Sequence, residues 1–200
     1  MQNVSDTAII ILAAGSSSRL GEPKQLLKIN GETLLEKSMT IALQTGVQDV
    51  FVVLGAGEKE LRPQLENRPV HIIQNMNWSK GIGSSLKAGL ARERQYRPDI
   101  QCVVIMVCDQ PHVTASHLMQ LLETHHATQK AIVASSYSST AGVPVLFAKS
   151  VFTQLEQLED GHGAKKIMEA HPEFLETVDF PGGSIDLDTP DDVRRFRQEA

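Results

Sequence analysis

The sequence predicts an α/β protein of three layers, in which a mostly parallel, Rossmann-like sheet lies between two layers of helices. One observation is the run Ile9–Leu12, which is apolar at every position, as in a strand covered on both faces of a parallel sheet. A second is the alternation of strand-like and helix-like segments along the chain. A third is the composition, with 41% hydrophobic but only 4% aromatic residues, which favours an aliphatic α/β core over a β-sandwich.

The first half of the chain alternates regularly between the two kinds of segment. After the first strand, Asn30-Gly31 predicts a turn. Thr33 and Glu36 have the spacing of a capping box, so we expect a helix that starts there and closes at Gly46. Further elements are expected as a strand at 49–54, a short polar helix at 57–65 and a strand at 70–74.

The middle of the chain predicts a buried strand followed by a helix. The run Cys102–Cys108 is uniformly apolar, like the first strand. The segment Thr114–His126 predicts a helix. We expect the three histidines of this helix on its solvated face, namely His117, His125 and His126.

The last third predicts two more strands and a helix. Lys130–Ser135 predicts a strand, and the polar run Ser135–Thr140 predicts a flexible loop. This loop leads into an expected strand over Ala141–Phe147. Thr189 is followed by Pro190 and two acidic residues, which is typical of a helix N-terminus, so we expect the final helix to begin there.

Length and charge limit the classes of function. Two hundred residues fit one domain, so we expect a single domain over residues 1–200. A net charge of −5 argues against a nucleic-acid-binding surface, which needs a basic excess. The apolar runs are too short to span a bilayer, and the start, MQNVSD, lacks the basic and apolar regions of a signal peptide. We therefore expect a cytoplasmic protein with no membrane or nucleic-acid partner.

Directly after the first strand, glycines, serines and two cations share one short segment. Gly15 is followed by three serines, Arg19, Gly21 and Lys24. Glycine lets the backbone approach a ligand closely, backbone N–H groups face its oxygens and the two cations neutralise its charge, which suits a polyphosphate. The spacing differs from a Walker loop and from the dinucleotide motif G-x-G-x-x-G. An ordinary strand-to-helix turn is the alternative.

The segment L-A-A-G-S-S-S-R-L-G-E-P-K resembles the signature of the small nucleotidyltransferases of the molybdenum-cofactor group, with Leu20 in place of the usual methionine. The resemblance implies a fold of the nucleotide-diphospho-sugar transferase type, with the loop Ala13–Lys24 wrapped around a nucleoside triphosphate. The segment N-x-x-W-x-x-G-x-x-x-S-L after the third strand also resembles this family and implies that Trp78 lies close to the nucleotide. A capped helix start is the structural alternative for that segment. The implied nucleotide-binding residues are Leu12, Ala13, Ala14, Gly15, Ser16, Arg19, Lys24, Gly81, Ser84 and Ser85.

Two separate segments offer carboxylates for a metal. Asp109 directly follows an apolar strand, and ligands of open parallel sheets collect at the carboxyl ends of the strands, where a carboxylate is placed to bind a metal. Asp186 and Asp188 alternate on one short extended run, so they point the same way. Both segments also suit simple helix or turn caps. C-D-Q-P and D-x-D-T-P resemble the metal-site elements of the family, which implies that Asp109 and Asp188 hold Mg²⁺.

Two further segments resemble parts of the family's acceptor site. Gly142 and Pro144 belong to a G-x-P-V segment, in which Val143 replaces the usual polar residue. The segment Asp160–Lys165 resembles a G-D-x-G-A-R segment, with its first two residues exchanged and lysine in place of arginine. The resemblance implies that Gly142, Pro144 and Lys165 contact the acceptor, whereas a loop entering a strand accounts for the first segment without one.

The resemblance as a whole implies a molybdenum cofactor cytidylyltransferase, which moves a CMP moiety from CTP to molybdopterin and releases pyrophosphate. Arg19, Lys24 and Asp109 would be the catalytic residues, acting with Mg²⁺ through positioning and electrostatics. Ala14 matches cytidylyl relatives, whereas guanylyl relatives tend to carry glycine at that position. The alternatives are a guanylyl or sugar-phosphate nucleotidyltransferase, and a non-catalytic nucleotide-binding accessory protein that delivers cofactor to a molybdenum hydroxylase client.

Overall fold

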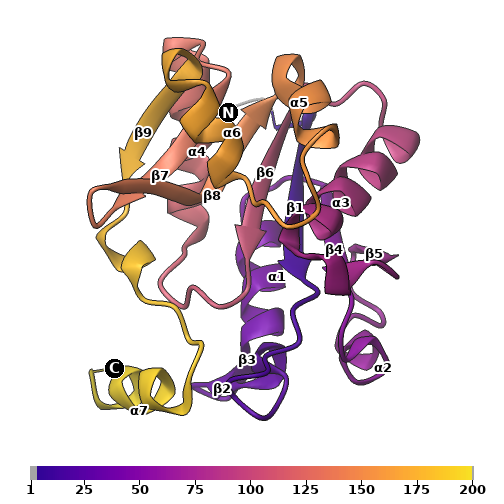
Figure 1. The fold of residues 1–200 in the computed structure, drawn as a ribbon, viewed down its shortest axis with the longest axis vertical. Helices are drawn as coiled ribbons and strands as arrows, with labels where there is room; N and C mark the ends of the chain where they lie inside the picture. The colour runs from indigo at the N-terminus through magenta and orange to yellow at the C-terminus, as the bar shows by residue number, and fades with distance from the viewer. Residues whose placement is uncertain (1–3, 200) are drawn as a thin grey trace.

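The protein is built on a seven-stranded sheet with the order β5-β4-β1-β6-β8-β7-β9 (Figure 1). The computed structural model describes residues 4–199, so residues 1–3, part of the start in which no signal peptide is expected, lie outside it. All neighbouring strands are parallel except those paired with β8, which is antiparallel to β6 and β7. The predicted mostly parallel sheet is confirmed. The strands are β1 (Thr7–Ala13), β4 (Asp49–Leu54), β5 (His71–Gln74), β6 (Cys102–Val107), β7 (Ile132–Tyr137), β8 (Thr140–Ala148) and β9 (Leu175–Asp179).

Helices cover both faces of the sheet, which confirms the predicted three layers (Figure 1). One face packs against α1 (Leu34–Gln44) and α4 (Ala115–Thr128), and the short α2 (Glu58–Leu61) adds to the same apolar cluster. The other face packs against α3 (Ile82–Tyr96), α5 (Phe152–Glu156) and α6 (Lys165–Ala170). Within residues 4–199, no helix is both long and apolar enough to cross a bilayer.

Strand β1 is apolar throughout because its two faces bury side chains in different layers. Ile9 and Ile11 belong to the cluster with α1 and α4, whereas Ile10 and Leu12 belong to the cluster with α3. Each of these side chains is at most 7% exposed. At roughly 1.5–3 kcal/mol for each fully buried aliphatic side chain, β1 is a large contributor to the free energy of folding.

A third, smaller apolar cluster joins the C-terminal helix to residues 27–34. The C-terminal helix α7 (Pro190–Glu199) contributes Val193 and Phe196, which pack with Leu27, Ile29 and Leu34. Strands β2 (Lys28–Ile29) and β3 (Glu32–Thr33) form a small hairpin beside this helix, as Figure 1 shows. The cluster therefore fixes the C-terminal segment against the residues that follow the glycine-rich loop Ala13–Lys24.

The capping predictions are confirmed at both helices. At α1, the Thr33 hydroxyl accepts from the Glu36 N–H, and the Glu36 carboxylate accepts from the Thr33 N–H. At α7, the Thr189 hydroxyl and the Asp192 N–H make the matching contact at 3.2 Å, and the Asp192 carboxylate accepts from the Thr189 N–H. Two orphan N–H groups are thus satisfied at each helix start.

The predicted loop over Ser135–Thr140 is wrong. Strand β7 continues to Tyr137 and β8 begins at Thr140, so the run forms a hairpin with a two-residue turn. Ser138 and Ser139 have φ of 50° and 59°. Such turns need positive φ at both central residues and usually contain asparagine or glycine, so the two serines gave no turn signal. Neither α5 nor β9 was predicted, because both are short and β9 lies at the edge of the sheet.

The expectation of a solvated His117 is also wrong. His117 is 5% exposed, and its Nε2 lies 2.7 Å from the hydroxyl of Ser135, which donates to the Pro144 carbonyl at 2.6 Å. Burial lowers the pKa of His117, so its ring is neutral at physiological pH. This buried chain of polar groups ties α4 to the β7–β8 hairpin. The other two histidines of α4 are half-buried or exposed.

Glu93 of α3 is a buried carboxyl that lacks a hydrogen-bond partner among the described residues. The residue is 1% exposed, and neither carboxylate oxygen has a hydrogen-bond partner among the described residues. Burial raises its pKa to about 7, the charges of Arg94 and Lys149 oppose the shift, and those of Asp49 and Asp99 add to it. The folded state therefore favours the neutral carboxyl.

Replacing Glu93 by glutamine should remove a pH dependence of stability. The pKa of Glu93 is raised from 4.5 to about 7 on folding, so its contribution to stability is complete below pH 4.5 and is lost as the pH rises through 7. We expect the free energy of unfolding of the wild type, relative to Glu93→Gln, to fall by about 1–2 kcal/mol between pH 5 and pH 8 in urea titrations. The exposed Glu123→Gln is the control. An identical difference at both pH values would contradict the expectation.

Candidate active site

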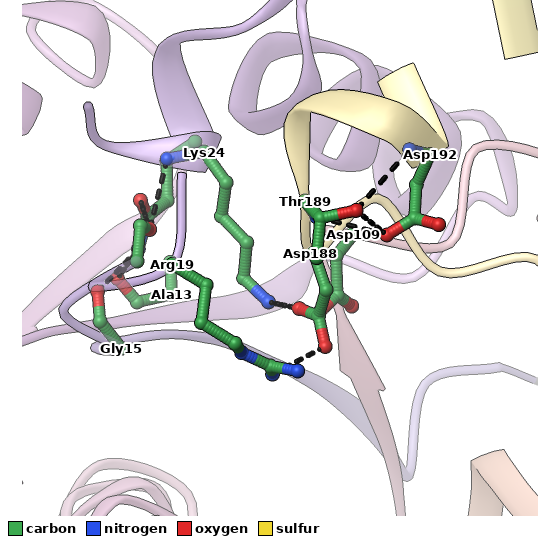
Figure 2. A network of polar contacts seen from close by, with 10 residues as sticks. Ala13, Gly15, Arg19, Lys24, Asp109, Asp188, Thr189 and Asp192 are labelled. Atoms are coloured by element: carbon green, nitrogen blue, oxygen red, sulfur yellow. Dashed lines mark hydrogen bonds and ion pairs between the residues drawn. The ribbon is translucent and has the colours of Figure 1, made fainter. Parts of the chain in front are cut away.

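The loop after β1 is held by the side chain of Ser17, within the loop, and by that of Gln25, which directly follows it. The Ser17 hydroxyl accepts from the Lys24 N–H at 2.9 Å, and the Ser17 carbonyl accepts from the Leu20 N–H at 2.9 Å. Behind the loop, the Gln25 amide donates to the carbonyls of Ala13 and Gly15. The loop is therefore closed on itself, and the side chains of Arg19 and Lys24 both extend from it toward Asp188 (Figure 2).

Four charged groups meet at this edge of the sheet, as Figure 2 shows. The Lys24 ammonium lies between two carboxylates: it forms an ion pair with Asp109 and donates to Asp188 Oδ1 at 2.8 Å. Arg19 donates to the other oxygen, Asp188 Oδ2, at 2.7 Å. The side chains of Lys24 and Asp109 are only 18% and 15% exposed, whereas Arg19 is 69% exposed. The two predicted cations and the two predicted metal carboxylates are thus brought together from three distant parts of the chain.

A backbone hydrogen bond holds the segment of Asp188 beside Asp109. The Leu187 N–H donates to the Asp109 carbonyl at 3.1 Å, which holds the irregular segment 185–189 against the end of β6. The Leu187 side chain is fully buried in the cluster with α7. The position of Asp188 therefore depends on the packing of the C-terminal helix.

The charges perturb one another in the expected directions. Burial alone would lower the pKa of Lys24, but its contacts with Asp109 and Asp188 outweigh burial and raise it. The hydrogen bond from Lys24 lowers the pKa of Asp188. Burial, followed by repulsion from Asp109 and Asp188, raises the pKa of Asp186 to about 6. Burial also raises the pKa of the Cys108 thiol to about 12, so it is no thiolate nucleophile at neutral pH.

The second glycine-rich turn is organised by one buried amide. Asn75 donates to the hydroxyls of Ser84 and Ser85 at 2.9 and 3.0 Å and accepts from the Asn77 N–H at 2.9 Å. The Gly83 N–H donates to the Asp160 carbonyl at 2.9 Å. A methyl group on Gly83 would lie 2.5 Å from backbone oxygens of that neighbouring loop, so this close approach requires glycine. The start of α3 is therefore fixed against β5 and against the segment around Asp160.

A cavity of about 320 Å³ lies between the two turns and ends at the charged groups. Eight residues predicted to bind nucleotide or metal line it: Leu12, Ala14, Gly15, Ser16, Lys24, Gly81, Ser85 and Asp109. Trp78, expected close to the nucleotide, also lines it. Its remaining walls come from Gln25, Ser79, Ile82, Val107 and Cys108. The volume falls at the small end of the range of ligand pockets.

The other predicted site residues lie outside this lining. Ala13 and Ser84 are buried behind it, and the Ser84 hydroxyl is committed to the carbonyls of Asn77 and Gly81. Arg19 and Asp188 lie at the charged cluster. The acceptor residues are separate: Gly142 packs against Tyr137, Pro144 is buried in β8, and Lys165 is exposed at the start of α6 near Glu169.

Sequence reasoning gave no role to two of the residues that shape the site. Gln25 and Asn75 are 1% and 4% exposed, and each ties several groups of a turn together. An amide side chain beside a glycine-rich turn indicates a structural role only when it is known to be buried, and the sequence does not show its burial. In the sequence, Gln25 stands between Lys24 and the apolar pair Leu26-Leu27, and Asn75 stands between Gln74 and Met76, so neither position shows a pattern that marks a buried polar side chain.

The carboxylates fit a hard divalent cation. One oxygen of Asp109, Oδ1, is buried without a hydrogen-bond partner in the described part of the chain. Oxygen donors are the ligands that Mg²⁺ and Mn²⁺ prefer, and Mg²⁺ keeps water and phosphate oxygens as further ligands. Among residues 4–199, no three His, Cys, Asp or Glu side chains form a metal-binding group. The oxygen donors that meet at this site are the carboxylates of Asp109 and Asp188.

Comparison with known proteins identifies the family. A family model described as MobA-like NTP transferase domain matches residues 9–174. The chain belongs to this family. The match covers both glycine-rich turns and Asp109, while Asp188 and α7 lie beyond it. The chain is accordingly a nucleotidyltransferase of this family, and the resemblance that its motifs carry is confirmed.

Individual relatives carry different names. The chain is 28% identical to Nicotine blue oxidoreductase of Paenarthrobacter nicotinovorans, over 94% of each chain. It is 35% identical to a probable molybdenum cofactor guanylyltransferase of Bacillus mycoides, over 65% of this chain and 62% of the relative. A crystal structure of Rv0371C from Mycobacterium tuberculosis in complex with manganese is 27% identical, with a TM-score of 0.74 over 97% of this chain and 99% of that one.

Removing the Lys24 ammonium should leave the carboxylates in need of another cation. We expect Lys24→Met to lower the free energy of unfolding by about 1–2 kcal/mol, less than for a fully buried pair because the groups are partly exposed. Millimolar Mg²⁺ should then raise the thermal midpoint of Lys24→Met by several degrees more than that of the wild type. Differential scanning fluorimetry measures both effects.

The control for this experiment is Lys59→Met, which removes an exposed lysine of α2. Lys59→Met should behave like the wild type, with and without Mg²⁺. If Lys24→Met matched Lys59→Met in both conditions, Lys24 would not be the counter-ion of these carboxylates.

Proposed function

We propose that this protein transfers a CMP moiety from CTP to the phosphate of a molybdopterin-type acceptor and releases pyrophosphate, with Mg²⁺. The observation that carries the proposal is the convergence of Lys24, Asp109, Asp188 and Arg19 at the end of a cavity lined by a glycine-rich loop. In the reaction, an acceptor phosphate oxygen forms a bond to the α-phosphorus. The bond from that phosphorus to the bridging oxygen breaks, and its electron pair leaves with pyrophosphate.

Lys24 has two alternative anionic partners in this proposal. In the structure its ammonium neutralises Asp109 and Asp188. With nucleotide bound, the two carboxylates would hold Mg²⁺, which would neutralise charge on the triphosphate and on the leaving pyrophosphate. Lys24 and Arg19 are then free to bind phosphate oxygens. The protein contributes positioning and electrostatics rather than a covalent intermediate.

The base part of the nucleotide is assigned to the end of the cavity at Trp78. A methyl group on Gly55 would come within 2.5 Å of Trp78 Cβ and 2.8 Å of Ala14 Cβ, so Trp78 and Ala14, which both line the cavity, pack closely against Gly55. The Ala14 methyl leaves less room than the glycine typical of guanylyl relatives, which supports the smaller pyrimidine. One buried methyl group separates ligands by about 10–200-fold, so this preference is modest.

Guanylyl transfer is the second candidate. It is favoured by the relative named a probable molybdenum cofactor guanylyltransferase, which has the higher sequence identity of the two relatives compared. Both candidates use the same charged groups and the same in-line displacement. They differ only in the nucleobase that the cavity accepts.

The acceptor is assigned to the side of the β7–β8 hairpin. Gly142 lies against the Tyr137 hydroxyl, which in turn lies 3.4 Å from the side-chain nitrogen of Gln110, the residue after Asp109. An acceptor bound at Gly142 and Pro144 would thus reach the charged cluster through this contact. Lys165 supplies a further cation in the same proposal, and a molybdenum hydroxylase in the cytoplasm would be the client that takes the finished cofactor.

Pyrophosphate release with CTP, GTP, ATP and UTP, each with Mg²⁺ and molybdopterin cofactor, tests the proposal. We expect release with CTP at least about tenfold faster than with GTP. Asp109→Asn should reduce the CTP rate by at least about a hundredfold, because a charged ligand at the reacting centre is lost. The exposed Asp179→Asn should leave the rate unchanged.

Each outcome of this assay tests a different part of the proposal. Release confined to GTP would replace the cytidylyl assignment by the guanylyl one. Binding of triphosphates without turnover by the wild type would contradict transfer to this acceptor. Undiminished activity of Asp109→Asn would remove Asp109 from the mechanism.

A further inference from the structure

The side-chain amide of Gln25 forms hydrogen bonds with three groups of the glycine-rich loop Ala13–Lys24. Its Nε2 donates to the Ala13 carbonyl at 2.9 Å and to the Gly15 carbonyl at 3.0 Å, and its Oε1 accepts from the Ser17 hydroxyl at 3.3 Å. The residue is 1% exposed. Both N–H donors of the amide are therefore used, and they connect the two ends of the turn that follows β1.

The two carbonyls that Gln25 binds determine where the next N–H groups point. In a planar trans peptide, the C=O of one residue and the N–H of the next point in opposite directions. With the carbonyls of Ala13 and Gly15 turned toward Gln25, the N–H groups of Ala14 and Ser16 are turned away from it. The intervening Ala14 carbonyl accepts from the Ala56 N–H at 3.1 Å, so the loop is fixed on both sides.

Gln25 also connects the backbone cradle to the cations. The Ser17 hydroxyl that contacts Gln25 accepts from the Lys24 N–H at 2.9 Å, and Ser17 has φ of 51°. Lys24 is thus positioned by the same bonds that set the loop. Ala14, Ser16 and Gln25 all line the cavity.

We propose that Gln25 is a positioning residue for triphosphate binding: by holding the carbonyls of Ala13 and Gly15, it presents the N–H groups of Ala14 and Ser16 to phosphate oxygens. This inference rests on the proposed function, because it assumes that the cavity takes a nucleoside triphosphate. Only a neutral amide suits this role. A carboxylate in its place would repel the two carbonyl oxygens, and an apolar side chain would leave them without donors.

Isothermal titration with CTP, and separately with GTP, in the presence of Mg²⁺ and without acceptor tests the role of Gln25. We expect Gln25→Glu to weaken triphosphate binding at least tenfold at pH 8. Lowering the pH to 6 should recover part of this loss relative to the wild type, since the introduced carboxyl, when protonated, donates one hydrogen bond to a carbonyl. Gln25→Met should weaken binding to a similar extent with no recovery at pH 6. Gln129→Glu, at the exposed end of α4, makes the same charge change as a control and should bind like the wild type at both pH values.

The outcomes separate this inference from the proposed function. Binding by Gln25→Glu within twofold of the wild type at pH 8 would overturn the role of Gln25 and leave the proposed function standing. A weakening with no recovery at pH 6, matched by a lower thermal midpoint, would indicate a structural role only and would also overturn it. A wild type that binds no triphosphate would instead contradict the proposed function itself. Gln25→Met keeps the test decisive if Gln25→Glu fails to fold.

Discussion

The arrangement of this protein's site depends on one electrostatic constraint: two carboxylates, Asp109 and Asp188, are held side by side and need a cation between them. Two negative charges that share one ammonium partner repel each other in a partly buried site unless a cation neutralises them. In the structure the Lys24 ammonium supplies that charge. Because the three residues come from three separate segments, their meeting is a property of the tertiary fold and not of any local motif.

Two features of the fold bring these charged residues together. The parallel strands β1 and β6 end at the same edge of the sheet, which places the loop of Lys24 beside Asp109. Asp188 is brought there by the C-terminal segment, whose position is fixed by the Leu187 contact to the end of β6 and by the apolar cluster of α7. The energy for holding the second carboxylate thus comes from hydrophobic packing at a distance from the site.

The sequence was most informative where residues close together in the chain determine the local structure. The uniformly apolar runs at β1 and β6, the capping box at Thr33 and the motif around Lys24 each specify their structure within a few residues. Tertiary contacts decided the rest. His117 and Gln25 are polar residues that the packing of other elements buries, while the turn at Ser138 adopts an unusual backbone for its residue type.

In our proposal, Lys24 and a divalent cation are alternative counter-ions of Asp109 and Asp188. A crystal structure with CTP and Mn²⁺, using anomalous scattering to locate the manganese, tests it most directly. We predict manganese bound by both carboxylates, with the Lys24 ammonium moved from them to phosphate oxygens. Manganese elsewhere, with Lys24 still paired to both carboxylates beside a bound triphosphate, would contradict the claim.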